Sequence, residues 1–82
     1  MTLLEEVRHL QRLPKPAQAR AIRQAAGISQ GRLAAELGVH RVTLLRWEAG
    51  ERMPRGASRL AYADLLRDLQ HVVLADEVPV GA

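Results

Sequence analysis

Glycine and proline residues recur along this chain at intervals that leave room only for short helices. A first stretch of helical periodicity is followed by Pro16, and the next three stretches end at Gly27, Gly38 and Gly50. Proline fits the first turn of a helix and glycine is favoured just after the last turn, so these residues mark starts and stops. Only residues 57–74 form a longer uninterrupted segment. The sequence therefore predicts a small bundle of helices.

The apolar residues between these breaks recur every three or four positions, which is the spacing of an amphipathic helix. Alanine and leucine make up most of the 48% of hydrophobic residues, a composition that favours helix over sheet. The expected helices cover residues 2–13, 16–26, 29–37, 40–49 and 57–74. We expect an all-α chain in three parts: an N-terminal amphipathic helix with a proline linker (1–16), a helical domain (17–74) and a flexible tail (75–82).

Several classes of protein are excluded or disfavoured by the residue types present. The chain has no cysteine, so it cannot form a disulfide, a thiolate zinc site or a cysteine nucleophile. Its three histidines lie on separate segments without metal-ligand spacing, and no catalytic set of side chains is evident. No apolar run reaches the roughly 18 residues that span a membrane. We expect a cytoplasmic protein that is not an enzyme and holds no metal or cofactor.

Positive charge is concentrated in the middle of the chain. Eight arginines and three glutamates lie between residues 20 and 59, whereas residues 60–82 carry one arginine and four acidic residues. Arginine binds phosphate through two hydrogen bonds and can read guanine in the same way. The distribution favours a surface that binds a polyanion, and a solvated helical face is the alternative.

The third and fourth expected helices are joined by only Gly38 and Val39, which is the geometry of a helix-turn-helix. Residues 28–54 read ISQGRLAAELGVHRVTLLRWEAGERMP. This segment resembles the helix-turn-helix of the phage repressor and Cro family, also called the xenobiotic-response-element family, without a gap. The matching positions are Ser29, Gln30, Leu33, Ala34, Leu37, Gly38, Val39, Thr43, Trp47, Glu48, Gly50 and Pro54.

With the flanking helices, the resemblance extends over about residues 17–70 and leaves the first helix outside it. It implies a five-helix, repressor-like domain that binds double-stranded DNA and regulates transcription. It also implies a homodimer on a palindromic operator. We expect a sequence-specific regulator, with repression as the favoured mode, located in the cytoplasm on the nucleoid.

The fourth helix has two faces of different chemistry at about 100° per residue. Leu44, Trp47 and Glu48 share one arc, which predicts that they pack inward. Val42, Leu45, Arg46 and Ala49 share the opposite arc, with Arg41 near its edge, so this face is predicted to enter the major groove. The two arginines can each donate two hydrogen bonds to guanine, and Val42 can contact a thymine methyl.

Phosphate contacts are expected on either side of this helix. Ser29 and Gln30 lie at the start of the third helix, whose free N–H groups suit a phosphate. The resemblance implies that Gln30 clamps the DNA backbone and braces the recognition helix. Arg52 and Arg55 lie in the loop after the fourth helix, beside the DNA backbone. The full set of expected DNA contacts is Ser29, Gln30, His40, Arg41, Val42, Thr43, Arg46, Arg52 and Arg55.

Two features follow from comparing the segment with the family pattern. The resemblance implies that Glu48 pairs with an arginine of the second helix, which by register is Arg23. His40 stands where the family has serine or threonine, so that helix start is expected either to be less well capped or to use the imidazole on DNA.

The first helix carries more apolar residues than its own packing needs, namely Leu3, Leu4, Val7, Leu10 and Leu13. A second apolar strip ends the long last helix. We expect a dimer made by Leu3, Val7, Leu10, Leu69 and Val72. The alternative is that the first helix folds back onto its own bundle.

Two other functions compete with this hypothesis. The same fold can serve as a protein-interaction module, such as an antitoxin or an adaptor for the transcription machinery, with the first helix as the docking element and a protein as partner. An excisionase-like architectural protein needs a β-wing after the recognition helix, where residues 57–74 are predicted to be helical instead.

Overall fold

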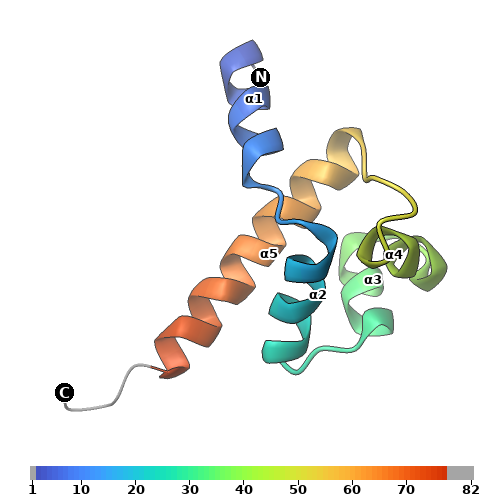
Figure 1. Ribbon diagram of the computed structural model, residues 1–82, viewed down its shortest axis with the longest axis vertical. Helices are drawn as coiled ribbons and strands as arrows, with labels where there is room; N and C mark the ends of the chain where they lie inside the picture. Colours follow the sequence, from blue (N-terminus) through green and yellow to red (C-terminus); the bar gives the residue numbers. More distant parts are fainter. Residues whose placement is uncertain (1, 78–82) are drawn as a thin grey trace.

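The computed structural model describes residues 2–77, with the side chains of residues 8–12, 76 and 77 outside the description. Within this range the chain forms five helices and no strand (Figure 1). They are α1 (Leu3–Arg12), α2 (Pro16–Ala25), α3 (Gln30–Leu37), α4 (Arg41–Glu48) and α5 (Gly56–Glu77). The predicted all-α fold is confirmed, and residues 57–74 are helical where a wing would need strands.

The helix starts are fixed by local side-chain and backbone chemistry. Thr2 accepts a hydrogen bond from the N–H of Glu5 at 3.2 Å, and the Glu5 carboxylate accepts one from the N–H of Thr2 at 3.3 Å. This reciprocal capping box satisfies two donors that the first turn leaves free. Pro16 occupies the first turn of α2, and the Ser29 hydroxyl caps α3 by accepting from the N–H of Arg32 at 3.1 Å.

The core lies where α2, α3, α4 and α5 meet. Leu33, Leu44 and Leu66 are fully buried and come from α3, α4 and α5 respectively. Trp47 of α4 packs beside Tyr62 of α5, with their ring centroids 5.1 Å apart. Each fully buried leucine contributes about 1.5–3 kcal/mol to folding, so these contacts set how the helices pack.

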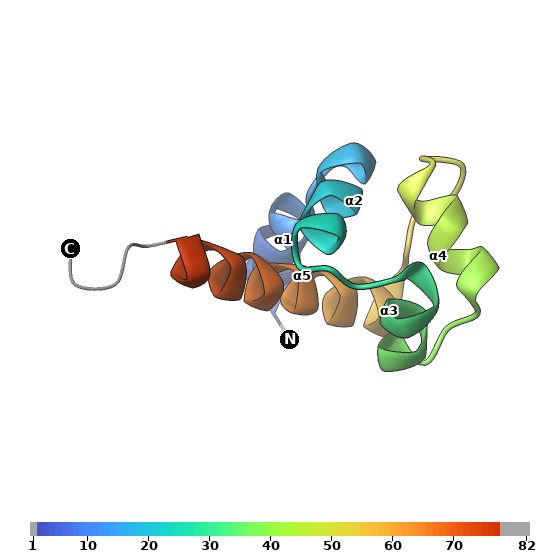
Figure 2. The ribbon, with the colours of Figure 1, turned by 90° about the horizontal axis from the view of Figure 1, so that it is seen from below.

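The first residues of helix α1 stand apart from this core. Its C-terminal neighbour Leu13 packs against the core, and α1 contacts α5. Leu3 and Val7, however, are 77% and 39% exposed, so the start of α1 does not fold back onto the bundle. Figures 1 and 2 both place α1 and the C-terminal half of α5 away from α4. The side chain of Leu10 lies outside the described residues.

The last helix differs from expectation at its end. Helix α5 continues to Glu77, three residues beyond the expected end at Leu74. Residues 75–77 are therefore helical and not part of a flexible tail. No residue directly after Leu74 breaks a helix, and the next such residue in the sequence is Pro79, which disfavours the helical conformation of the residue before it. Residues 78–82 of the expected tail lie outside the described residues.

The apolar strip on α5 also differs from expectation. Leu69 is half-buried and packs against the core cluster, because its side chain faces the other helices. It therefore offers less surface to a dimer contact than an exposed residue would. Val72 is 58% exposed and Leu74 is 53% exposed. The exposed part of the strip starts after Leu69.

Candidate nucleic-acid interface

The turn between α3 and α4 is stabilised by backbone hydrogen bonds and by the His40 side chain. Gly38 ends α3 in the left-handed conformation with φ 69°, which glycine adopts without the steric cost that a Cβ brings. Val39 then donates its N–H to the carbonyl of Ala34 at 3.0 Å. His40 Nδ1 accepts from the N–H of Val42 at 3.2 Å and so caps α4. The expectation of a less well capped turn is wrong, because the imidazole takes the place of a hydroxyl.

The two faces of α4 are divided as the periodicity predicts. Leu44 is fully buried, and Trp47 and Glu48 are 6% and 7% exposed. The opposite face is exposed over Arg41, Val42, Leu45 and Arg46, and Thr43 is half-buried between the two faces. The packed face holds the helix while the exposed face is presented outward, next to the start of α3.

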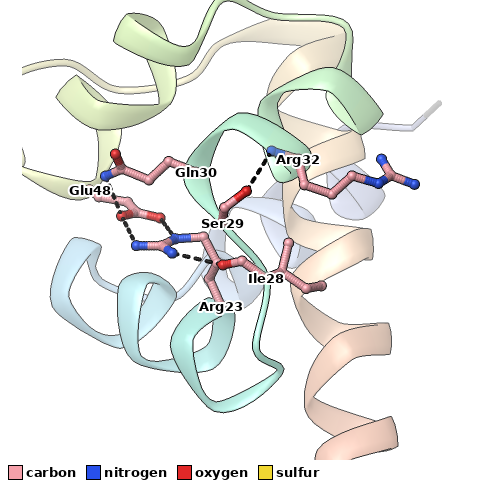
Figure 3. Close-up of polar contacts among 6 residues, drawn as sticks. All are labelled: Arg23, Ile28, Ser29, Gln30, Arg32 and Glu48. Atoms are coloured by element: carbon pink, nitrogen blue, oxygen red, sulfur yellow. Dashed lines mark hydrogen bonds and ion pairs between the residues drawn. The ribbon is translucent and has the colours of Figure 1, made fainter.

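A buried ion pair holds α4 against α2. The Arg23 guanidinium donates from Nε to Glu48 Oε2 at 2.6 Å and from Nη2 to Glu48 Oε1 at 3.0 Å (Figure 3). Its remaining nitrogen donates to the carbonyl of Ile28 at 2.8 Å. Hydrogen bonding to Glu48 raises the pKa of the Arg23 guanidinium above its ordinary value, against the opposing effect of burial. The pair implied by the resemblance is present in the structure.

Gln30 extends this network to the surface. Its Nε2 donates to Glu48 Oε1 at 3.1 Å, as Figure 3 shows, so the first residue of α3 is bonded to the last residue of α4. An amide nitrogen has two hydrogens, and only one is used in this bond. The second can serve a ligand outside the protein. The resemblance implied that Gln30 braces the recognition helix, and the structure shows that its partner there is Glu48.

The loop after α4 forms a groove with a basic lining. Arg46, Arg52 and Arg55 line this groove, whose volume is about 600 Å³. Thr43 and Ser58 add hydroxyl groups to the lining, and the Glu51 carboxylate offsets one of the three positive charges. We therefore call the surface formed by Arg46, Arg52, Arg55, Thr43 and Ser58 the basic groove.

Sequence reasoning missed Ser58 as part of the basic groove. Its position in the first turn of α5, directly after the arginine-containing loop, was the available signal. The remaining expected contacts lie nearby in the chain: Ser29 and Gln30 at the start of α3, His40 at the turn, and Arg41 and Val42 at the start of α4. Arg41 approaches α3, since its Cδ lies 3.8 Å from where a Cβ on Gly31 would be.

Comparison with known protein families gives a match to the helix-turn-helix family over residues 20–69. The chain belongs to the Cro/C1-type helix-turn-helix family. It is thus a DNA-binding regulator of helix-turn-helix type. The match begins within α2 and ends within α5, so α1 lies outside the family domain, as the resemblance implied. No curated protein and no solved structure shows a significant match to the chain.

Two further observations concern other kinds of site in this helix-turn-helix protein. Among the described residues, no group of three His, Asp or Glu side chains is arranged to hold a metal ion. No helix of the described chain is both long enough and apolar enough to cross a membrane.

Proposed function

We propose that the protein binds a specific sequence of double-stranded DNA by placing α4 in the major groove. The exposed face of α4 carries the proposal, because Arg41 and Arg46 lie outward while Leu44 and Trp47 anchor the helix from behind. A helix fits the major groove, which is about 12 Å wide, and arginine can donate two hydrogen bonds to guanine there. These two arginines are the base-reading residues of the proposal.

Phosphate contacts flank the reading helix in this arrangement. The N–H groups at the start of α3, beside Ser29, and the second amide hydrogen of Gln30 can donate to one phosphate. Arg52 and Arg55 of the basic groove are suited to a phosphate of the other strand. His40 at the start of α4 and Thr43 within it complete the contact surface. Phosphate contacts of this kind fix the register of α4 without selecting a sequence.

A homodimer on a palindromic operator is the assembly we propose. Leu3 and Leu4 are 77% and 61% exposed on a helix that lies outside the family domain. Exposed apolar side chains of this kind mark an interaction surface when they are contiguous. Two recognition helices about 34 Å apart would then read two half-sites one turn apart. Repression is the proposed mode, because a protein seated in the groove of a promoter blocks polymerase by its bulk, and its place would be on the nucleoid in the cytoplasm.

Selection of bound sequences from a random pool of double-stranded DNA tests this proposal. Enrichment of a symmetric site is the expected result. Arg46→Ala should then cost about 1–3 kcal/mol on that site and relax the preference at the positions that Arg46 reads. Arg52→Ala should weaken binding to every sequence and lower the slope of log K against log salt by about one. Failure to enrich any sequence would overturn the proposal.

A control variant removes the same charge elsewhere. Arg67 lies on α5 beside Asp64 and Asp68, at 3.5 and 3.7 Å. Because these carboxylates repel a phosphate, Arg67→Ala should leave both affinity and salt slope close to those of the wild type. A loss as large as that of Arg52→Ala would show that the measured effect reports net charge and not a contact.

The exposed start of α1 favours one second candidate function, a protein-interaction module such as an antitoxin or an adaptor. In that case α1 would dock on a partner protein through Leu3, Leu4 and Val7. Purification of the full chain from its host separates the two functions. A stoichiometric protein partner that is lost in Leu3→Glu, together with no enriched DNA sequence, would favour the second candidate.

A further inference from the structure

The reading face of α4 contains two large apolar side chains. Val42 is 39% exposed and Leu45 is 44% exposed. They are three residues apart, so they lie on one side of the helix as neighbours. The adjacent Leu44 is fully buried and supplies the packing that this helix needs. Val42 and Leu45 are therefore available for contact with a ligand.

Both side chains are partly covered by the rest of the described chain, but neither is buried. Both are absent from the core cluster and from the partly buried side chains packed against it. Arg41 precedes Val42 and Arg46 follows Leu45, and both arginines are exposed. The pair thus forms an apolar centre with a cation at each end. We call Val42 and Leu45 the apolar centre of α4.

The surroundings of the apolar centre select one kind of occupant. Arg52 and Arg55 extend the positive charge into the basic groove next to α4. An occupant must therefore be anionic overall and yet offer small apolar groups at the depth that α4 reaches. The major groove of DNA combines these properties, because its phosphates flank a floor on which the C5 methyl of thymine is the apolar group. A 5-methylcytosine presents the same methyl group at the same ring position.

We propose that Val42 and Leu45 together recognise pyrimidine C5 methyl groups, and that Leu45, the more exposed of the two, is the main determinant of this preference. The inference rests on the proposed function, since it concerns the same face of α4. It implies half-sites in which methyl-bearing pyrimidines lie between the guanines read by Arg41 and Arg46. Burying one methyl group against an aliphatic side chain strengthens binding about three- to fivefold.

DNA in which single methyl groups are removed or added tests this inference. In the first arm, each thymine of the selected site is replaced in turn by deoxyuridine, which removes only the methyl group. The wild type should lose about three- to fivefold in affinity at the thymines under α4 and nothing at thymines outside the site. In the second arm, each cytosine is replaced by 5-methylcytosine, which should strengthen binding by a similar factor where a cytosine faces the apolar centre.

Variants connect the effect to the two side chains. Leu45→Ala and Val42→Ala should each lose sensitivity to the methyl group at their own positions, and both should melt like the wild type because the side chains are exposed. Arg46→Ala, the matched control on the same face, should keep the methyl sensitivity although its affinity is lower. Loss on deoxyuridine identifies thymine as the source of the methyl, and gain on 5-methylcytosine alone identifies the modified base.

Two outcomes would overturn the inference while leaving the proposed function intact. One is a wild type that binds its selected site equally well with and without every methyl group. The other is a Leu45→Ala variant that remains as sensitive as the wild type. Absence of sequence-specific binding to any DNA, by contrast, would remove the proposed function itself, so the two failures are distinguishable.

Discussion

Glu48 connects three parts of the molecule through one carboxylate. It accepts two hydrogen bonds from Arg23 of α2 and one from Gln30 of α3, while it belongs to α4. The side chains of Arg23 and Glu48 are only 9% and 2% exposed. A buried pair of this kind adds little net stability over an apolar substitute, but removal of one partner leaves an uncompensated charge. At the scale of the residue, the position of α4 therefore depends on a complete network.

We expect Glu48→Ala to lower the free energy of unfolding by about 3–5 kcal/mol, because it strands the Arg23 guanidinium. Chemical denaturation measures this loss. Glu36→Ala is the matched control, because it removes an ion pair at the surface. The side chains of Glu36 and Arg32 are 55% and 65% exposed, so this variant should lose less than about 1 kcal/mol of stability. Unchanged stability of Glu48→Ala together with lost DNA binding would instead make Glu48 a DNA contact.

Tyr62 is a second buried polar residue with a testable consequence. Its hydroxyl has no hydrogen-bond partner among the described residues, and the ring is 2% exposed. Burial, assisted by the nearby Glu48 carboxylate, raises the pKa of the phenol well above its ordinary value, although Arg23 opposes the shift. The folded protein thus keeps the phenolic proton at a pH where the unfolded chain releases it. Stability should therefore fall as the pH rises above about 10, by at most about 1.4 kcal/mol per pH unit.

Tyr62→Phe should remove this alkaline slope and raise the free energy of unfolding at neutral pH by about 1 kcal/mol, because it deletes an unpaired buried hydroxyl. Tyr62 is the only tyrosine in the chain, so tyrosinate absorbance reports its titration directly. A wild type that shows tyrosinate absorbance while still folded at about pH 10 would contradict the assignment.

At the scale of the element, the helix-turn-helix depends on one glycine in a special conformation. Gly38 has φ 69°, and a Cβ placed on it would meet no atom within 4 Å. The cost of a side chain there is therefore backbone strain and not a clash. Gly31, within α3, differs: its Cβ would lie in ordinary contact at 3.8 Å from Arg41 Cδ. The two glycines form a natural pair for comparison.

We expect Gly38→Ala to lower the free energy of unfolding by about 1–2 kcal/mol, which is the cost of a left-handed conformation for an L-residue. Gly31→Ala should raise it by about 0.5–1 kcal/mol, because alanine loses less backbone entropy in a helix. Thermal melting of the two variants measures both shifts. Equal effects of the same sign would show that the turn is not held by the conformation of Gly38.

At the scale of the whole molecule, DNA-reading surface and apolar surface lie on different parts. The recognition helix and the basic groove are together, whereas α1 and the C-terminal half of α5 lie away from α4 (Figure 2). Leu3 and Val7 of α1 and Val72 of α5 are exposed in these two parts, which lie toward opposite ends of the molecule in Figure 1. A dimer made by these residues would leave both copies of α4 free to face DNA.

Leu3→Glu combined with Val7→Glu should give a folded monomer that binds a full operator no better than a half-site, because two charges cannot be buried in an apolar contact. Sedimentation measures the oligomeric state. Gln24→Glu with Ala25→Glu adds the same charge on an exposed part of α2 and should leave the dimer intact. A double α1 variant that still sediments as a dimer would show that this helix does not make the interface.

Much of the fold could be predicted from the chain alone because its determinants act over one or two helical turns. Pro16 and Gly38 mark helix ends through their own φ preferences, and the Ser29 hydroxyl reaches an N–H only three residues away. The inward position of Leu44 and Trp47 follows from a period of 3.6 residues. The partnership of Arg23 with Glu48, 25 residues apart, came from the resemblance to a family and not from any local rule.

The contacts between helices, and the burial that follows from them, were decided by the tertiary structure. Leu69 and Val72 are equally apolar and lie on one helix, yet only Leu69 packs against the core. The resemblance implied that Gln30 braces α4, but its bond to Glu48, across 18 residues of sequence, depends on how α3 and α4 pack against each other. The exposure of Leu3 likewise reflects the direction in which α1 leaves the bundle. Local backbone preference determines where a helix begins and ends. Which side chains are buried depends instead on contacts between helices, and these contacts exist only in the folded chain.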